Sequence, residues 1–303
     1  MSDFALAKLY RELILLLKIL CSIHSDKSEH SNRQILKHNF TIFGFRIEIL
    51  KMHINIPEGK KIYFSSDNHL GAPTYEESRP RETKFIQWLD EIKKDAAAIF
   101  LLGDLFDFWF EYKHVVPKGF VRTLGKLAEI SDSGIPIYFF VGNHDLWMKD
   151  YFKEELNITV YHEPQVFQLA KKQFFIGHGD GLGPGDKGYK RMKKVFTNPF
   201  SKWLFRWLHP DLGVALAKHL SVKNKLISGD DDAKFLGEEN EWLVQYSKRK
   251  LAEKHYDYFI FGHRHLPLEI ELENKAKYIN LGDWISYYTY AVFDGENLEL
   301  KEF

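Results

Sequence analysis

Five short polar clusters, each following an apolar run, restrict the fold of this chain more than any other feature. In chain order they are Asp67-Asn68-His69, Gly103-Asp104, Gly142-Asn143-His144-Asp145, Gly177-His178-Gly179-Asp180 and Gly262-His263-Arg264-His265. Carboxylates, neutral imidazoles and one amide in this mixture suit two divalent transition metals rather than one. Two-metal sites of that kind are typical of enzymes that cleave phosphate esters and anhydrides.

The segments around the first three clusters alternate between strand and helix patterns. Short β-rich runs that each end in a cluster occupy 61–66, 97–102 and 137–141. Helical spacing of apolar residues is present at 82–93 and 119–131. This order predicts a parallel sheet with the clusters at the carboxyl ends of its strands. Further strands are expected at 166–170, 173–176, 258–261, 268–272, 277–281, 287–293 and 298–301. The simplest architecture is an α/β fold of two packed sheets with helices outside.

Residues 181–254 interrupt this pattern with a long, mostly helical and unusually aromatic segment. Its apolar side chains include Phe196, Phe200, Trp203, Leu204, Phe205, Trp207 and Leu208, with lysines and arginines between them. Because the segment lies between two clusters, it is placed to form a lid beside the metals. The alternative is a helical hairpin packed on the domain with a solvated basic face, and both interpretations remain open.

The first 51 residues differ in character from the rest. Apolar residues between Phe4 and Leu20 recur at helical spacing, and 22–37 is polar and expected to be a linker. We therefore expect an extension over 1–51 and one domain over 52–303. The helix has three interpretations: a membrane-surface or partner helix, a helix that docks on the domain, or an over-long start with Met52 as the true first residue.

Composition excludes some functions. Lys+Arg and Asp+Glu both number 42, so a general electrostatic attraction to nucleic acid is not indicated. The single cysteine, Cys21, cannot form an intrachain disulfide, which fits a reducing compartment. No apolar stretch approaches the roughly 20 residues that a membrane-spanning helix needs.

Local geometry indicates how the clusters would hold two ions. Asp67 and His69 are two residues apart, so at a strand end their side chains point to the same side. Asp104 follows a glycine, which lets the backbone turn sharply and bring the carboxylate close to the cations. A carboxylate can bridge two metals, and one of these is expected to do so. The other candidate ligands are the amide oxygen of Asn143 and the imidazoles of His178, His263 and His265.

The order and wording of the clusters resemble those of the calcineurin-like metallophosphoesterases, over about 61–303. The resemblance implies a four-layer αββα sandwich with a helical insertion as lid, and two divalent ions, expected to be Mn²⁺. It implies that the first ion is held by Asp67, His69, Asp104 and His265. It implies that the second is held by Asp104, Asn143, His178 and His263.

The same resemblance gives a catalytic role to His144, which is not a ligand in that family. This residue would face the scissile phosphate and stabilise charge or protonate the leaving group. Asp107, three residues after the bridging Asp104, is a candidate to orient His144. The alternative for Asp107 is an acid at a helix N-terminus.

Within that family, the run Gly103 to Trp109 and the His-Gly-Asp sequence followed by Asp186 and Tyr189 resemble the UDP-2,3-diacylglucosamine pyrophosphohydrolases of lipid A synthesis. The resemblance implies that Asp186 and Tyr189 contact the sugar nucleotide; the alternative is that either residue caps or packs the first helix of the insertion. It implies that the insertion, with Trp203 and Phe205, holds acyl chains. The products would be UMP and 2,3-diacylglucosamine 1-phosphate, and the enzyme would be cytoplasmic and peripheral to the inner membrane.

Two departures and two alternatives accompany this reading. The best-known members of that group carry Arg at the position of His144, and their pattern within the insertion is not reproduced around Ser221, Asn224 and Lys225. Another phosphodiester or phosphomonoester is an alternative substrate, and a non-catalytic scaffold is a further alternative. Arg81 could meet a phosphate or be an exposed loop residue. The sequence does not indicate an oligomeric state.

Overall fold

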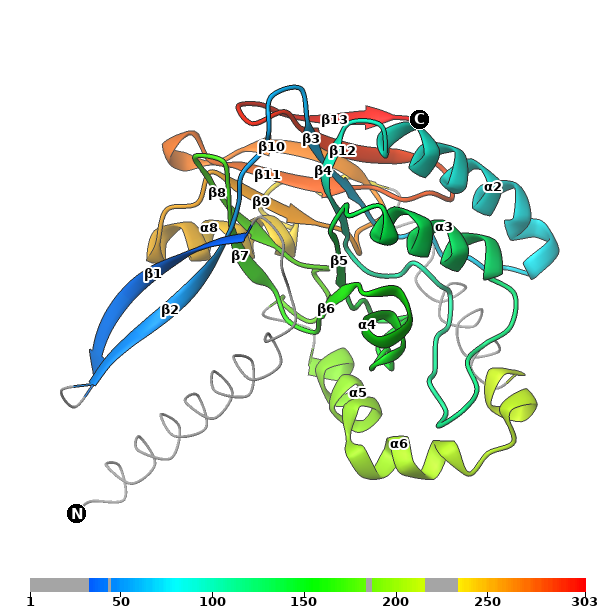
Figure 1. Cartoon of the computed structure of the whole chain (residues 1–303). Coiled ribbons are helices and arrows are strands. Elements are labelled where there is room, and N and C mark those ends of the chain that lie inside the picture. The colour runs from blue at the N-terminus through cyan, green and yellow to red at the C-terminus, as the bar shows by residue number, and fades with distance from the viewer. Residues whose placement is uncertain (1–32, 43–44, 184–186, 216–233) are drawn as a thin grey trace, which may run out of the picture. The chain divides into compact units, whose positions relative to one another are not determined.

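The computed structural model describes residues 33–42, 45–183, 187–215 and 234–303 (Figure 1). By internal packing the chain divides into Met1–Gln34 and Ile35–Phe303, and nearly all described residues belong to the second unit. Neither the helix expected within residues 4–20 nor Asp186 lies within the described residues.

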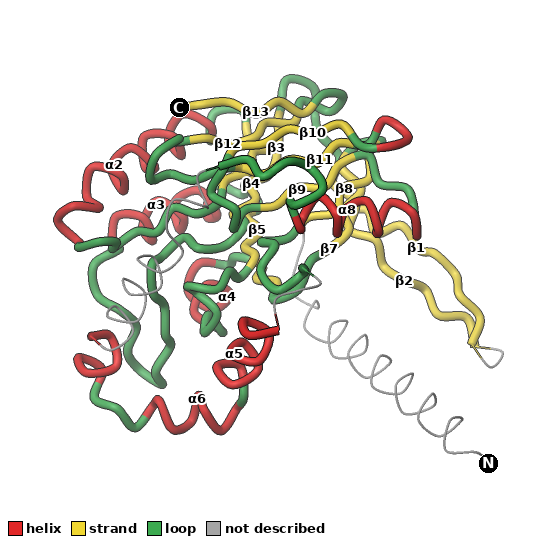
Figure 2. Tube along the Cα trace, turned by 180° about the vertical axis from the view of Figure 1, so that it is seen from behind, coloured by secondary structure: helices red, strands yellow, loops and turns green. Residues whose placement is uncertain are grey.

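The described strands form two mixed sheets (Figures 1 and 2). The six-stranded sheet has the order β13 (Leu298–Glu302), β12 (Thr289–Phe293), β3 (Lys61–Ser65), β4 (Ala96–Leu101), β5 (Ile137–Phe140) and β6 (Thr159–Tyr161). The seven-stranded sheet has the order β1 (Arg33–Ile42), β2 (Phe45–Ile54), β7 (Gln165–Leu169), β8 (Lys172–Ile176), β9 (Tyr258–Phe261), β11 (Lys277–Leu281) and β10 (Pro267–Glu271). The expected parallel pairing of β3 with β4 and of β4 with β5 is confirmed, as is the β7–β8 hairpin.

Alternating side chains of the central strands bind the layers together. Ile62 and Phe64 of β3 point into a core between the two sheets, where they meet Phe174 of β8 and Ile279 of β11. Tyr63, between them, belongs to a second core on the opposite face. This period of two is what a strand buried on both faces requires.

Helices cover both outer faces, so the expected four-layer αββα sandwich is confirmed. Helices α2 (Tyr75–Ile92), α3 (Val121–Asp132) and α4 (Tyr151–Leu156) pack on the six-stranded sheet, and α8 (Trp242–Glu253) packs on the other. Helix α2 begins earlier than the predicted residue 82, because Thr74 caps it by accepting a hydrogen bond from the backbone N–H of Glu77. Every helix within the described ranges is too short or too polar to cross a bilayer.

The domain boundary expected at residue 52 falls inside β2. Met52, His53 and Ile54 pair with β7 in parallel register, and the linker expected over 22–37 overlaps β1. The pairing partner of β2 lies more than a hundred residues further along the chain, so local sequence could not reveal it. Within 181–254, the described helices are α5 (Lys187–Thr197), α6 (Pro199–Arg206) and α8, and residues 216–233 lie outside the described ranges. Because α8 packs on the seven-stranded sheet, the insertion is taken below to end at residue 241.

Candidate dinuclear metal centre

The seven predicted ligands follow five strands and converge at one edge of the two sheets. Asp67 and His69 follow β3, Asp104 follows β4, Asn143 follows β5, His178 follows β8, and His263 and His265 follow β9. Their ligand atoms form overlapping groups that could hold metal ions, one of Asp67, His69 and His265 and another of Asp104, His178 and His263.

Asp104 stands between the two groups. Its Oδ2 lies 3.7 Å from Nε2 of His69 on one side and 3.3 Å from Nε2 of His178 on the other. Oδ1 of Asp67 lies 3.8 Å from Nε2 of His69 and 3.5 Å from Nε2 of His265. The geometry therefore allows Asp104 to contact two ions at once.

The backbone conformation of five candidate ligands sets the direction in which their side chains point. The φ angles of Asp67, His69, Asp104, His263 and His265 are 54°, 44°, 52°, 66° and 58°. Residues other than glycine seldom adopt the left-handed region, and such strain concentrates at functional sites. It indicates that side-chain placement at this edge outweighs backbone preference.

Two glycines give the strand ends room to approach each other. A Cβ atom on Gly262 would lie 1.9 Å from Oγ of Ser66 and 2.3 Å from Oδ2 of Asp67. A Cβ on Gly142 would lie 2.2 Å from Oδ1 of Asp104. Both clusters therefore need glycine at these positions for close approach, independently of its conformational freedom.

The donor set fits divalent cations. Asp67 Oδ1 and His69 Nε2 are buried at the centre without a hydrogen-bond partner among the described residues, which is costly unless something else satisfies them. Nδ1 of His178 donates to the carbonyl oxygen of Leu102 at 2.6 Å, so its Nε2 is left for a cation. Nδ1 of His265 is similarly engaged with Oδ2 of Asp283 at 3.2 Å.

Opposite charges set the protonation states of the centre. Burial alone would raise the pKa of Asp67 and Asp104, but nearby imidazoles outweigh it and hold both pKa values well below the usual range. Burial alone would lower the pKa of His178, whereas Asp104 and Asp67 raise that pKa to about 10. Burial and the neighbouring His178 lower the pKa of His263 to about 4. The carboxylates are thus ready to bind cations, and His178 must release a proton to do so.

His144 lies beside the ligands, with its ring oriented by Asp107. Its Nδ1 is 2.9 Å from the backbone carbonyl oxygen of Asp107, and its backbone N–H donates to Oδ1 of Asp104 at 2.8 Å. Oδ1 of Asp107 lies 3.5 Å from Nδ1 of His144 and 3.4 Å from Nδ1 of His69. All residues from 103 to 112 are described and no helix begins there, so the alternative role of Asp107 as a helix N-terminal acid is wrong.

Several supporting residues escaped the sequence reasoning. Asp283 engages His265, and its other oxygen accepts hydrogen bonds from three backbone N–H groups, those of Ile285, Ser286 and Tyr287. Asp145 accepts from the backbone N–H groups of Gly142 and Leu105, and burial with the charge of Asp104 raises its pKa to about 8. Asp145 was visible in the Gly-Asn-His-Asp cluster, whereas no local signal marked Asp283.

Arg81 is not an exposed loop residue. Its side chain is buried, and Nη2 donates to the carbonyl oxygens of His69 at 2.7 Å and Ala72 at 2.5 Å. The guanidinium therefore supports the loop that carries His69. The interpretation of Arg81 as an exposed loop residue is wrong, because the residue is buried within α2 and its guanidinium binds backbone carbonyls.

The predicted substrate-binding residues are distributed unevenly around the centre. Tyr189 donates to Oδ2 of Asp180 at 2.6 Å, and its ring centroid lies 6.4 Å from that of His263. Phe205 packs against Phe110 and Trp147, with ring centroids 4.7 and 4.6 Å away. Trp203, two residues earlier on α6, is 51% exposed. The structure thus places Tyr189 beside the metal centre. Phe205 packs against aromatic residues of the domain, whereas Trp203 is exposed.

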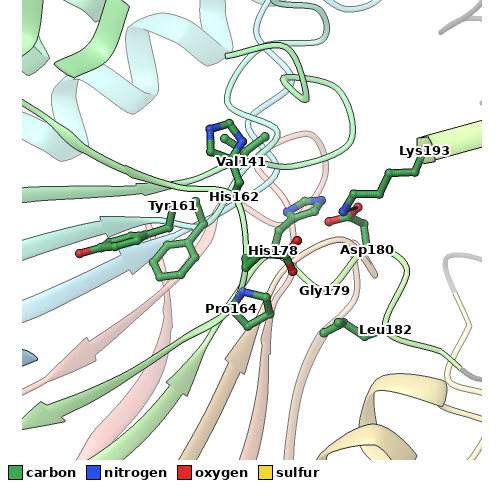
Figure 3. Close-up of a pocket in the computed structure, with 11 residues that line it drawn as sticks. Val141, Tyr161, His162, Pro164, His178, Gly179, Asp180, Leu182 and Lys193 are labelled. Atoms are coloured by element: carbon green, nitrogen blue, oxygen red, sulfur yellow. Dashed lines mark hydrogen bonds and ion pairs between the residues drawn. The ribbon is translucent and has the colours of Figure 1, made fainter. Parts of the chain in front are cut away.

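A small pocket adjoins the centre at the foot of α5 (Figure 3). Its lining combines the candidate ligand His178 with Asp180, Tyr161, His162 and Lys193. Lys193 points toward Asp180, whose Oδ2 it contacts at 2.6 Å (Figure 3). Helix α5 therefore contacts Asp180 through two side chains that lie one helical turn apart, those of Tyr189 and Lys193.

Comparisons with known proteins agree with this geometry. Residues 60–267 match the family model described as calcineurin-like phosphoesterase. A protein named UDP-2,3-diacylglucosamine hydrolase from Porphyromonas gingivalis is 40% identical over 255 residues, covering 80% of this chain and 97% of that protein. A protein of the same name from Pseudomonas fluorescens is 30% identical over 251 residues, covering 80% of this chain and 95% of that protein.

Proposed function

The chain belongs to the calcineurin-like phosphoesterase family, and we propose that this metal-dependent hydrolase cleaves the diphosphate of UDP-2,3-diacylglucosamine. Water adds to one phosphorus, the anhydride bond breaks, and the products are UMP and 2,3-diacylglucosamine 1-phosphate. The relatives' name suggests this substrate. The observation that carries the proposal in this chain is an apolar cleft that opens beside the metal centre.

Two adjoining pockets make up this cleft and share Tyr75 and Val214. The inner pocket is lined by Leu70, Gly71, Tyr75, Asp107, Phe108, Phe120 and Val214. The outer pocket is lined by Tyr75, Tyr112, Val115, Val116, Pro117, Lys118, Pro210, Asp211, Val214 and Ala215. Asp107 lies both at the metal centre and in the inner pocket, and we propose that a substrate with its phosphates at the ions extends an attached acyl chain toward the outer pocket. Each buried CH₂ contributes about 0.8 kcal/mol, which a soluble phosphodiester could not gain.

The proposed ligands are the seven residues predicted for the two ions, and Mn²⁺ is proposed because the donors are carboxylates, imidazoles and one amide. Two bound ions would supply an activated water nucleophile and offset charge on the phosphoryl oxygens. His144 is proposed to face the scissile diphosphate, and Asp107 to hold its ring. Tyr189 is proposed to bind the sugar nucleotide together with Asp186.

Contact with the inner membrane surface, from the cytoplasmic side, is proposed for helix α6 and the residues after it. The exposed apolar side chains there are Phe200, Trp203, Leu204, Trp207 and Leu212. Arg206 is also exposed on this segment. Aromatic residues with nearby cations are typical of segments that lie in a membrane interface. Phe205 is proposed to support the cleft instead, since it packs on the body of the domain and lies against Gly213.

The test compares kcat/KM of the full-length Mn²⁺-loaded protein for UDP-2,3-diacylglucosamine, UDP-N-acetylglucosamine and a chromogenic phosphodiester, with product analysis. We expect the acylated substrate to be preferred by orders of magnitude and to yield UMP. Equal rates on both sugar nucleotides would contradict the lipid assignment while keeping the hydrolase. Metal binding without any turnover would favour a scaffold.

A matched pair of variants separates the two apolar surfaces. Trp203→Gln should weaken binding to anionic vesicles while leaving the kcat of the chromogenic reaction unchanged. Phe205→Ala should reduce the preference for the acylated substrate and lower the melting temperature, because it removes contacts with Phe110 and Trp147. Unaltered vesicle binding by Trp203→Gln would contradict the proposed membrane face.

A further inference from the structure

Arg264, between the two candidate ligand histidines of the last cluster, forms a buried ion pair with Glu241. Its Nε lies 3.0 Å from Oε2 of Glu241, and its Nη2 lies 3.2 Å from Oε1. The exposed fractions of the two side chains are only 6% and 2%. Such a two-pronged pair fixes orientation as well as distance.

Glu241 stands where the insertion returns to the domain. It is the residue before α8, and its Oε1 also accepts a hydrogen bond from the backbone N–H of Leu236 at 3.2 Å. Nη2 of Arg264 donates in addition to the carbonyl oxygen of Lys234 at 2.5 Å. The ion pair thus ties residues 234–241, the described end of the insertion, directly to the metal loop.

The beginning of the insertion packs against Trp242, the first residue of α8, and Trp242 in turn lies beside His263. The indole lies 5.8 Å from the ring of His263 in a T-shaped arrangement. A Cβ atom on Gly183 would lie 3.0 Å from this indole, so the entry of the insertion packs closely against it. Both ends of the insertion therefore meet at the loop that carries His263 and His265.

Stability does not explain the pair. Ion pairs in protein interiors lose much of their attraction to desolvation, and apolar replacements are often as stable. The loop itself is strained, since His263 and His265 have φ angles of 66° and 58°. Such a conformation persists only where its surroundings hold it in place. The Arg264 side chain is one of those restraints, together with Asn280, which donates to the carbonyl oxygen of Gly262 at 2.6 Å.

We propose that Arg264 and Glu241 are positioning residues. Their ion pair holds the loop that carries His263 and His265 against residues 234–241, where the insertion rejoins the domain. The affinity for both ions then depends on the same contact that holds the insertion in place, because His265 is assigned to the first ion and His263 to the second. A second consequence rests on the proposed function: loss of the pair should impair an acylated substrate more than a small one, because only the former uses the insertion.

The experiment weakens the pair with little change in shape: Glu241→Gln removes the negative charge, and Arg264→Lys keeps its charge but loses the two-pronged contact. Glu241→Gln and Arg264→Lys are stripped of metal and titrated with Mn²⁺ by calorimetry as full-length proteins, and their melting temperatures are measured. Each should bind both Mn²⁺ equivalents about 10- to 100-fold more weakly, as for other residues that orient metal ligands. Glu238→Gln is the matched control, because Glu238 pairs with Lys248 at the surface of the same region, and it should bind Mn²⁺ normally.

A double variant, Arg264→Met with Glu241→Leu, covers the case in which a single variant fails to fold. It fills the interior without charge, so it should fold and still bind both ions more weakly. Wild-type Mn²⁺ affinity in a folded variant would overturn the proposal. The KM for the chromogenic diester should rise less than the KM for the acylated substrate. The Mn²⁺ titration needs no substrate, so its outcome is independent of whether the proposed substrate is correct.

Discussion

Nδ1 of His144 lies 2.9 Å from the backbone carbonyl oxygen of Asp107, closer than Oδ1 of the Asp107 carboxylate, which is 3.5 Å away. A carbonyl only accepts hydrogen bonds, so Nδ1 carries the proton, and Nε2 of the neutral ring does not. The backbone rather than the acidic side chain therefore sets the tautomer of His144.

His144→Ala should keep both metal equivalents and lower kcat by roughly 10²- to 10⁴-fold, as for removal of a charge-stabilising or acid group. His144→Arg should retain more activity than the alanine variant, because a guanidinium supplies charge at the same place. Metal analysis and steady-state kinetics on both variants check this. Loss of one metal equivalent in His144→Ala would identify His144 as a ligand.

Asp107→Asn should affect the metals more than the tautomer of His144. The backbone carbonyl that holds the ring is unchanged, whereas the carboxylate 3.4 Å from Nδ1 of His69 is lost. We expect Mn²⁺ affinity to fall by about 10- to 100-fold, with near-normal kcat at saturating Mn²⁺. A kcat that stays low at saturation would assign the carboxylate a direct catalytic role.

Asp104→Asn should disrupt both metal sites, because its Oδ2 is within 3.7 Å of ligands on either side. Lost stabilisation of the paired ions corresponds to about a thousandfold loss in rate or more. The exposed Asp132→Asn is a charge-matched control and should behave as wild type. Near-full Mn²⁺-dependent activity in Asp104→Asn would show that this carboxylate does not bridge the ions.

Gly262→Ala should abolish tight Mn²⁺ binding, since the added methyl group would overlap Ser66 and the carboxylate of Asp67. Gly125→Ala, within α3, is the matched control because nothing lies within 4 Å of its added Cβ. Alanine there should stabilise the fold by about 0.5–1 kcal/mol through helix propensity. Calorimetric Mn²⁺ titration and thermal unfolding compare the two, and normal Mn²⁺ binding by Gly262→Ala would contradict the close approach.

Deletions at the N-terminus should separate the extension from the sheet. Removing residues 1–32 leaves β1 and β2 intact and should not change the melting temperature or the chromogenic activity. Removing 1–51 takes away β1 and most of β2, which uncovers the edge of β7. That variant should aggregate or melt earlier, because an unpaired edge strand exposes backbone groups, yet it should still bind Mn²⁺. Equal stability of both deletions would show that β2 contributes little.

Local sequence determined the central strands, their order and the positions of the clusters. The runs that became β3, β4, β5 and β9 are short, apolar and each followed by a ligand, so periodicity and the parallel-sheet rule were sufficient to bring Asp67, Asp104 and His178 to one edge. The resemblance to calcineurin-like phosphoesterases then indicated how the ligands divide between two ions.

Tertiary structure alone decided what holds those ligands in place. Asp283 reaches His265 across 18 residues, Glu241 reaches Arg264 across 23, and β2 pairs with β7 across more than a hundred. None of these partners is marked by periodicity, because a buried polar contact depends on which chain segments the fold brings together. The left-handed backbone at His263 and His265 is likewise invisible in the sequence, since it arises from restraint by distant neighbours rather than from the preference of histidine itself.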